Sequence, residues 1–259
     1  MKKSIILFLI TFIFLRNINA VKFEVNGIAY EITRTTPPLE VAVTSKSSFG
    51  LYNGDIEIPE SVTYGTNTYM VTSIGNSAFY NCDNLLSVKI SGTITAIERQ
   101  AFYDCGAITS IIIPESVTNI ADVAFAGCIK LKDVSIPNSV LTIGASAFAN
   151  CSTLVNITLP EKLTIINSSL FEKCAKLVYI NIPDKVTKIG NLAFQGCGLT
   201  EVKIPETVTS IGNEAFCYCK FSSVVLPSKL TYLGSAAFSY CKLLTTITIP
   251  PLLKTLYNS

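Results

Sequence analysis

The chain has 259 residues, of which 49% are hydrophobic and 15% are charged, so it is not an intrinsically disordered tail. Twenty Lys and Arg residues against eighteen Asp and Glu residues leave a net charge of +2, and no basic stripe runs along the sequence, which predicts no nucleic-acid partner. Histidine is absent, which excludes Ser-His-Asp and Cys-His catalysis and His-ligated zinc.

The first twenty residues have the pattern of an export signal. Lys2 and Lys3 precede an apolar run over residues 4–15, and a polar stretch then ends at Ala20. We therefore predict a signal peptide over residues 1–20, cleaved after Ala20, and a secreted or cell-surface protein without a membrane span after cleavage. A retained signal anchor is the alternative, although an apolar run of about 12 residues is short for a bilayer.

Residues 21–72 have the pattern of a small β module. Strand-like segments over 21–25 and 28–32 flank Asn26-Gly27, a two-residue hairpin signal, and residues 40–43 and 55–58 continue the pattern. Residues 64–70 add a further predicted hairpin. Because the end of a repeat array exposes its core, we predict that this module is an N-terminal β cap.

Residues 73–259 repeat one unit of 22–23 residues. A cysteine follows each repeated phenylalanine by three positions, and both series advance in the same steps, which predicts eight stacked units and a truncated ninth. The phenylalanines are Phe79, Phe102, Phe125, Phe148, Phe171, Phe194, Phe216 and Phe238, and the cysteines are Cys82, Cys105, Cys128, Cys151, Cys174, Cys197, Cys219 and Cys241.

Each unit reads as a strand, a second extended piece and a short helical turn. Leu177, Ile180 and Ile182 alternate toward Pro183, which ends the first strand, and the β-branched Val-Thr-x-Ile segment that follows is also extended. The three-residue spacing in Ala-Phe-x-x-Cys fits one helical turn, which predicts an α/β repeat solenoid. The glycine after the second Ile is replaced by Glu98 in one unit, so this position should not require a positive φ.

Over residues 56–259 these units resemble the BspA-type leucine-rich repeats of bacterial surface proteins, which also occur in some parasitic protists. The unit from Ile204-Pro205 through Gly212 and Phe216 to Cys219 is the cleanest copy. The resemblance implies a right-handed leucine-rich-repeat solenoid with a parallel β-sheet on its concave side. It also implies an adhesin or a host-protein binder.

The repeated cysteines and carboxylates are the candidates for chemistry. One thiol in each unit, three residues after a core Phe, favours a buried small hydrophobe, with disulfide pairing or metal binding as the alternatives. Glu206 and its equivalents after the repeated proline favour a solvated turn, with a calcium site as the alternative. Neither series supplies one unique acid pair, so we predict no enzyme, no metal and no cofactor.

The outward strand positions are where the units differ from one another. A hot spot of a protein interface usually contains Tyr, Trp or Arg, and Tyr179 is the one aromatic residue among these positions. We therefore predict a contact patch of Tyr179, Asn181, Glu201 and Lys203 on the floor of the concave sheet. The sixteen positions are 87, 110, 133, 156, 179, 201, 223 and 246 before the inward residue, and 89, 112, 135, 158, 181, 203, 225 and 248 after it.

Two functions fit this surface. The first is a protein-binding or adhesion module that engages an extracellular or host protein through the concave face, with a glycan as a further possible ligand. The second is a structural spacer, or an element that stacks on itself through its C-terminal coil. The ninth unit ends before its Phe, so the sequence is either a fragment of a longer surface protein or ends in a coil that a partner or a second copy covers.

Overall fold

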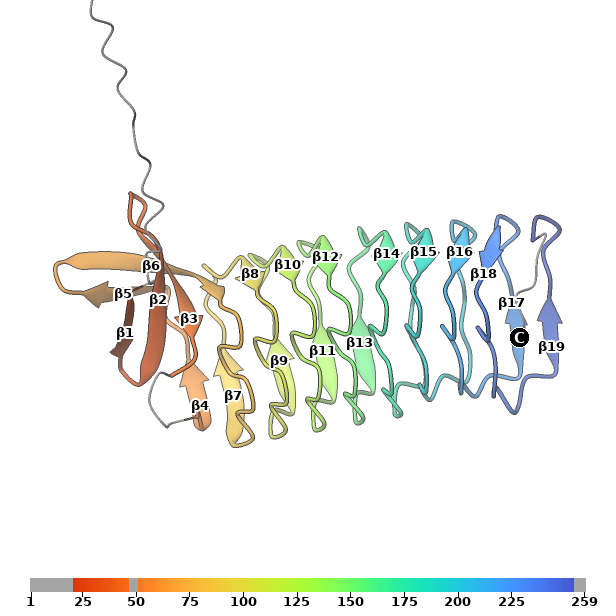
Figure 1. Ribbon diagram of the computed structural model, residues 1–259, viewed down its shortest axis with the longest axis horizontal. Coiled ribbons are helices and arrows are strands. Elements are labelled where there is room, and N and C mark those ends of the chain that lie inside the picture. Colours follow the sequence, from red (N-terminus) through yellow and green to blue (C-terminus); the bar gives the residue numbers. More distant parts are fainter. Residues whose placement is uncertain (1–20, 47–50, 254–259) are drawn as a thin grey trace, which may run out of the picture.

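The structure is a computed structural model that describes residues 21–46 and 51–253. It is a β-solenoid of about eight turns, preceded by a small β-sheet (Figure 1). Within the described residues there is no helix, so the predicted α/β class is wrong. The predicted signal peptide lies outside the described residues. No helix among them is long and apolar enough to cross a membrane.

Two rows of parallel strands run along the solenoid axis (Figure 1). The strands before each repeated proline form the long-strand face: β4 (Gly54–Glu57), β7 (Leu85–Lys89), β9 (Ser110–Ile112), β11 (Asp133–Ser135), β13 (Asn156–Thr158), β17 (Ser223–Val225) and β19 (Thr246–Thr248). The Val-Thr-x-Ile segments form the short-strand face: β8 (Ala96–Ile97), β10 (Asn119–Ile120), β12 (Thr142–Ile143), β14 (Ile165–Ile166), β15 (Lys188–Ile189), β16 (Ser210–Ile211) and β18 (Tyr232–Leu233). Both predicted extended pieces are therefore confirmed in most coils.

The Ala-Phe-x-x-Cys segment is a series of turns, because its N–H groups donate alternately to a carbonyl oxygen of the same coil and to one of the next coil. Phe79 N–H donates to Ala101 O of the next coil at 2.8 Å, whereas Tyr80 N–H donates to Ser77 O at 3.2 Å. Ser77 and Asn81 have φ of 54° and 55°, and each later coil repeats this pair of left-handed residues at equivalent positions. A helix of L-residues cannot contain such residues, so the predicted helical turn is wrong.

The repeated phenylalanines form one continuous stack inside the solenoid. Neighbouring rings lie 5.0–6.0 Å apart, centroid to centroid, and are nearly parallel. The widest step, 6.0 Å, separates Phe148 from Phe171, where the buried Leu170 replaces the alanine of the other coils. One coil therefore buries its rings only against its neighbours, as expected of a repeat array.

Glycine occupies five of the eight short-strand corners, and packing explains its presence there. Gly212 does not have a positive φ, as the sequence predicted. A Cβ at Gly212 would lie 2.5 Å from the backbone nitrogen of Asn191 in the preceding coil, and at Gly234 it would lie 2.4 Å from that of Asn213. The close approach of the coils, and not a left-handed conformation, favours glycine at these positions.

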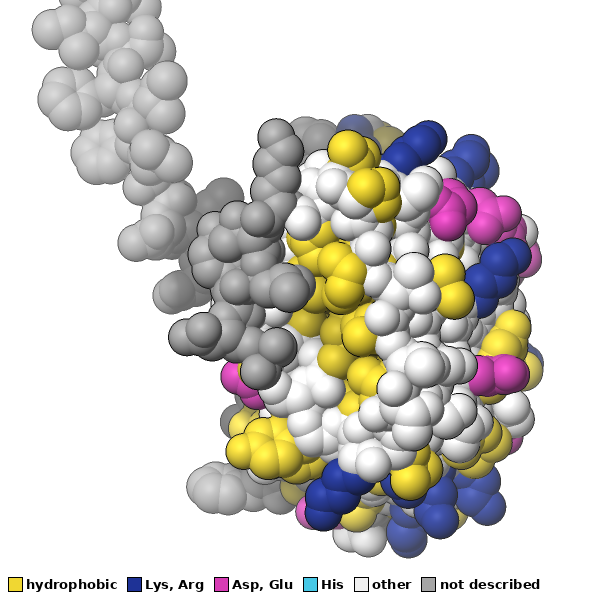
Figure 2. All heavy atoms as spheres, turned by 90° about the vertical axis from the view of Figure 1, so that its right-hand side faces the viewer, with side chains coloured by type: hydrophobic (Ala, Val, Ile, Leu, Met, Phe, Trp, Pro, Cys, Tyr) yellow, Lys and Arg dark blue, Asp and Glu magenta, His cyan; other side chains and the backbone are white. Residues whose placement is uncertain are grey.

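The last strand that the structure describes is β19, and its inward side chain is exposed. Ile247 is 36% exposed, whereas the equivalent Val224 one coil earlier is 3% exposed. In the view onto this end of the molecule, hydrophobic side chains form a stripe across the last coil (Figure 2).

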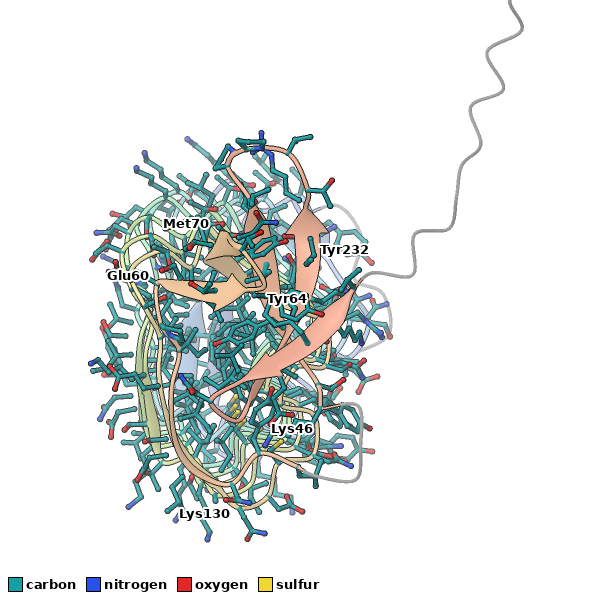
Figure 3. All side chains as sticks on the ribbon, turned by 90° about the vertical axis from the view of Figure 1, so that its left-hand side faces the viewer. Lys46, Glu60, Tyr64, Met70, Lys130 and Tyr232 are labelled. Carbon is teal, nitrogen blue, oxygen red and sulfur yellow. The ribbon has the colours of Figure 1, made fainter. Side chains whose placement is uncertain are left out.

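The N-terminal module shares one sheet with the solenoid. Its strands are β1 (Lys22–Val25), β2 (Ile28–Arg34), β3 (Glu40–Thr44), β5 (Ser61–Tyr64) and β6 (Asn67–Ile74). The strand order β1-β2-β3-β6-β8-β10-β12 is continuous, and both predicted hairpins are confirmed because β1 pairs with β2 and β5 pairs with β6, each antiparallel. Figure 3 looks onto this end, where Tyr64 and Met70 lie on β5 and β6.

Tyr52 connects this module to the first Phe of the stack. Its hydroxyl accepts the Ala29 N–H at 2.9 Å and donates to Thr44 O at 2.8 Å, and its ring centroid lies 4.7 Å from that of Phe79. Burial raises the pKa of Tyr52 strongly, so the hydroxyl remains a donor. The role of the module as a cap stays a prediction.

Candidate functional site

All nine cysteines are free thiols and all are buried, as the sequence favoured. From the second coil onward, the repeated Cys donates through Sγ to the carbonyl oxygen of the Phe one coil earlier, at 3.0–3.3 Å; Cys151, for example, donates to Phe125 O at 3.2 Å. Burial raises the pKa of Cys151 and of Cys197 to about 12. The reactive thiolate is therefore scarce at neutral pH, and the thiols serve as core residues with a weak hydrogen-bond donor.

The polar residues after the repeated proline join neighbouring coils. Asn138 Oδ1 accepts the Glu161 N–H at 2.9 Å, and Glu206 Oε2 accepts the N–H and hydroxyl of Ser228 at 2.9 and 2.8 Å. These hydrogen bonds lower the pKa of Glu206. Among the described residues there is no group of three or more His, Cys, Asp or Glu side chains that could hold a metal ion.

The sixteen predicted outward positions are all exposed on the long-strand face. Some pair across neighbouring strands: Lys89 Nζ contacts Glu57 Oε1 at 2.5 Å, and Asn156 Nδ2 donates to Asp133 Oδ1 at 2.7 Å. Ile112 is 83% exposed in the middle of this polar row. The backbone is therefore constant from coil to coil, while the exposed side chains change.

The predicted contact patch of Tyr179, Asn181, Glu201 and Lys203 lies between the sheet β9–β11–β13 and the pair β17–β19. Among the described residues, no regular strand forms near residue 180, where one was predicted. A single parallel bridge joins Asn181 to Lys203 there. That bridge places the four side chains in two adjacent coils, and all four are exposed, with Tyr179 at 53%.

The repeat first shortens from 23 to 22 residues within the gap between these two groups of strands. The corner between Cys197 and Leu199 has one residue fewer than in the preceding coils. Gly198 occupies this corner, and a Cβ there would lie 2.5 Å from the carbonyl oxygen of Ala175. The shorter corner thus passes close to the preceding coil, beside the contact patch.

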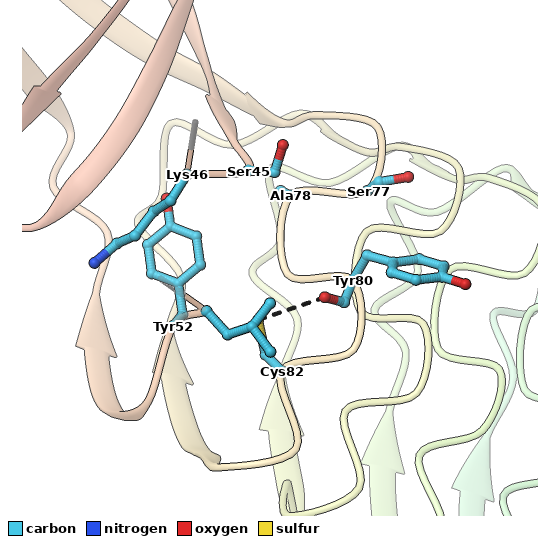
Figure 4. A pocket seen from close by; sticks show the side chains of 8 residues that line it. Ser45, Lys46, Tyr52, Ser77, Ala78, Tyr80 and Cys82 are labelled. Carbon is cyan, nitrogen blue, oxygen red and sulfur yellow. Dashed lines mark hydrogen bonds between the residues drawn. The ribbon is translucent and has the colours of Figure 1, made fainter. Parts of the chain in front are cut away.

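A cavity of about 370 Å³ lies between the N-terminal module and the first coil (Figure 4). Lys46 Nζ stands 5.0 Å from the centroid of the Tyr52 ring at its wall, and Cys82 Sγ lies 3.8 Å from Tyr80 O. Burial raises the pKa of Cys82, so this thiol is protonated near neutral pH. The cavity offers an ammonium group, hydroxyls and apolar walls, and no activated nucleophile.

Sequence reasoning missed a stacked tyrosine pair in which both rings are exposed. Tyr218 and Tyr240, two positions after the repeated Phe, stack with centroids 4.6 Å apart and an interplanar angle of 3°. They are 50% and 64% exposed. Because the repeat places them one above the other, their common position relative to Phe216 and Phe238 is the signal that could have found them.

The comparisons with known proteins agree with this architecture. The model of the BspA type Leucine rich repeat region matches residues 55–178 and 164–259, with six copies of the repeat. No curated protein sequence matches the chain significantly.

Solved structures similar to this chain include leucine-rich-repeat proteins. A leucine-rich repeat protein from Bacteroides ovatus is 27% identical, with a TM-score of 0.63 over 87% of this chain and 70% of that one. A leucine rich cell surface protein from Faecalibacterium prausnitzii is 28% identical, with a TM-score of 0.60 over 88% of this chain and 54% of that one, so this chain spans about half its length. The pneumococcal vaccine antigen PcpA, at 19% identity and a TM-score of 0.65 over 90% of this chain and 71% of that one, shares the fold. The repeat, the β-solenoid and the matched family model together show that this chain belongs to the BspA-type leucine-rich-repeat family.

Proposed function

We propose that this protein is a secreted or cell-surface binding module without enzymatic activity, and that it engages an extracellular or host protein through its long-strand face. The observation that carries the proposal is the contrast between the two sides of the strands. Inward positions repeat the same apolar residues and are almost all buried, whereas the sixteen outward positions are all exposed and differ between coils. A rigid backbone with variable exposed side chains suits recognition by shape, as in other repeat proteins.

Tyr179, Asn181, Glu201 and Lys203 are the proposed centre of the contact. Tyrosine contributes a large, partly apolar surface and a hydroxyl, and such residues dominate the binding energy of protein interfaces. Tyr179 is half exposed, and a cation and an anion flank it within the same two coils. The cell-surface relative from Faecalibacterium prausnitzii supports the proposed location.

The test is capture of purified serum and extracellular-matrix proteins by residues 21–259 immobilised on a sensor. A Tyr179→Ser/Lys203→Gln variant should lose at least tenfold in affinity for any protein that the unmodified chain captures. The matched control is Tyr232→Ser/Lys188→Gln, which removes the same two side-chain types from the short-strand face. Equal affinity of the two variants would contradict the proposed patch.

A second candidate, self-stacking through the C-terminal coil, is favoured by the exposed inward residues there. Ile247 and Ile249 are 36% and 44% exposed, although equivalent residues in earlier coils are buried or partly buried. If this coil pairs with a second copy, the mass measured by light scattering should rise with concentration, and Ile249→Lys should abolish the rise. Ile112→Lys, at an exposed position of the long-strand face, is the control. A constant monomer mass would exclude this candidate.

A further inference from the structure

The corners around each repeated cysteine, from the residue before it to the start of the next long strand, form one long edge of the solenoid, at the bottom of Figure 1. From the third coil onward this edge carries six exposed lysines, which the sequence distributes over four coils. Figure 3 shows Lys130 at this edge, and Figure 2 shows Lys and Arg side chains gathered along the bottom of the molecule. We call the following residues the lysine edge: Lys130, Lys132, Lys173, Lys176, Lys220 and Lys242.

The positive charge of this edge is largely uncompensated. Lys173 Nζ lies 3.4 Å from Glu172 Oε1, whereas within the part of the chain that the structure describes the other five lysines are in no ion pair. The first two coils carry Asp83 and Asp104 at the same edge and no lysine. The summed charge of the edge from the third coil to the eighth is therefore positive, although the fourth and sixth coils add no lysine and the net charge of the whole chain is only +2.

Two tyrosines stand on the lysine edge at positions that do not favour them. Tyr218 and Tyr240 have φ of 63° and 58°, the left-handed region, where other coils carry residues such as Gly127 or Asn150. A bulky residue in this conformation costs about 1 kcal/mol or more. The turn itself forms with glycine or asparagine, so the fold does not require tyrosine at either position. Stacking offsets part of this cost and leaves the pair half exposed beside Lys220.

We propose that the lysine edge binds an acidic polysaccharide that runs along the solenoid axis. Neighbouring coils stand ~4.8 Å apart, so the lysines from the third to the eighth coil line an edge about 24 Å long. Such a line of ammonium groups matches carboxylate or sulfate groups on successive sugars, and the outer faces of the Tyr218–Tyr240 pair suit the apolar faces of sugar rings. Arginine is the preferred residue for phosphate recognition, and none lies on this edge, which favours a polysaccharide over a nucleic acid.

The test measures binding of the purified protein to sensors coated with polygalacturonate or dextran sulfate. A Lys220→Gln/Lys242→Gln variant should bind about 30-fold more weakly, since each lysine at an anionic surface contributes a factor of about 5. The control is Lys162→Gln/Lys185→Gln, which removes two exposed lysines from the post-proline corners. The control should bind within twofold of the unmodified protein, and binding should fall steeply between low and high salt.

A second variant tests the tyrosines. Tyr218→Asn/Tyr240→Asn keeps the left-handed turns, because Asn81 and Asn150 occupy the same position in other coils. It should weaken binding severalfold and leave the salt dependence unchanged. Equal binding of the two lysine variants would overturn the proposal, as would equally tight binding to uncharged dextran. Tighter binding to vesicles with one anionic lipid in four, or to a single-stranded oligonucleotide, would replace the polysaccharide with that partner.

Discussion

Removing one ring from the middle of the phenylalanine stack should destabilise the solenoid strongly and locally. Phe148 is fully buried, and its ring lies 5.2 Å from that of Phe125 and 6.0 Å from that of Phe171, centroid to centroid. Replacing a buried Phe with Ala costs roughly 3–5 kcal/mol, which includes the lost ring contacts. Because each coil contacts only its neighbours, Phe148→Ala weakens both interfaces of the fourth coil.

The matched variant is Phe238→Ala in the last coil. Phe238 is partly buried and stacks on one neighbouring coil, with its ring 5.3 Å from that of Phe216. We expect this change to reduce the free energy of unfolding by about half as much, roughly 1.5–2.5 kcal/mol, since about half of the packing is lost.

Urea denaturation followed by circular dichroism measures both costs, and amide hydrogen exchange locates them. Phe148→Ala should accelerate exchange most in the coils on either side of residue 148 and least in the N-terminal module. The stacking model is refuted if Phe148→Ala costs less than about 1 kcal/mol or no more than Phe238→Ala.

Three further changes test other contacts. Because burial raises the pKa of Cys151 to about 12, its contribution to stability is complete below the unfolded thiol pKa of about 8.5 and falls between these values. Cys151→Ala should therefore reduce the loss of unfolding free energy from pH 9 to 10 by about 1.2 kcal/mol, and an unchanged loss would contradict this. Gly198→Ala should cost about 1–3 kcal/mol in urea denaturation because its Cβ meets backbone, while Gly92→Ala, with open space around its Cβ, should be nearly neutral; equal costs would refute the close approach. Because the pKa of Glu206 is lowered in the folded protein, its contribution to stability is present above the unfolded carboxyl pKa and is lost in acid. Glu206→Gln should therefore lower Tm at pH 7 and leave it unchanged at pH 2, and a Tm difference that persists at pH 2 would argue against the charged acceptor.

The strict period made most of the fold predictable from the sequence. Positions that repeat every 22–23 residues with the same apolar type, such as Phe148 and Cys151, must face inward, because stacked coils bury equivalent residues together. The same argument placed Tyr179 and the other outward positions at the surface, and the structure confirms their exposure. Local turn chemistry at Asn26-Gly27 was equally reliable, since the hairpin there depends only on adjacent residues.

The class of the repeat was wrong because sequence spacing did not separate two conformations. Apolar residues three apart, as in Phe148 and Cys151, fit one helical turn and fit a chain of β-turns equally well. The choice depends on where the alternate N–H groups find acceptors, and the Phe148 N–H finds Leu170 O in the next coil at 3.1 Å.

The tertiary structure alone decided the contacts between coils. From Cys105 onward, the acceptor of each repeated cysteine thiol lies 25 or 26 residues away, so no local pattern reveals it. The sheet is interrupted at the Tyr179 patch, and Lys130 to Lys242 gather on one edge, because stacking superimposes residues that are far apart in the sequence. The sequence by itself therefore determined which residues face outward, and the stacking of the coils determined which of them share a surface.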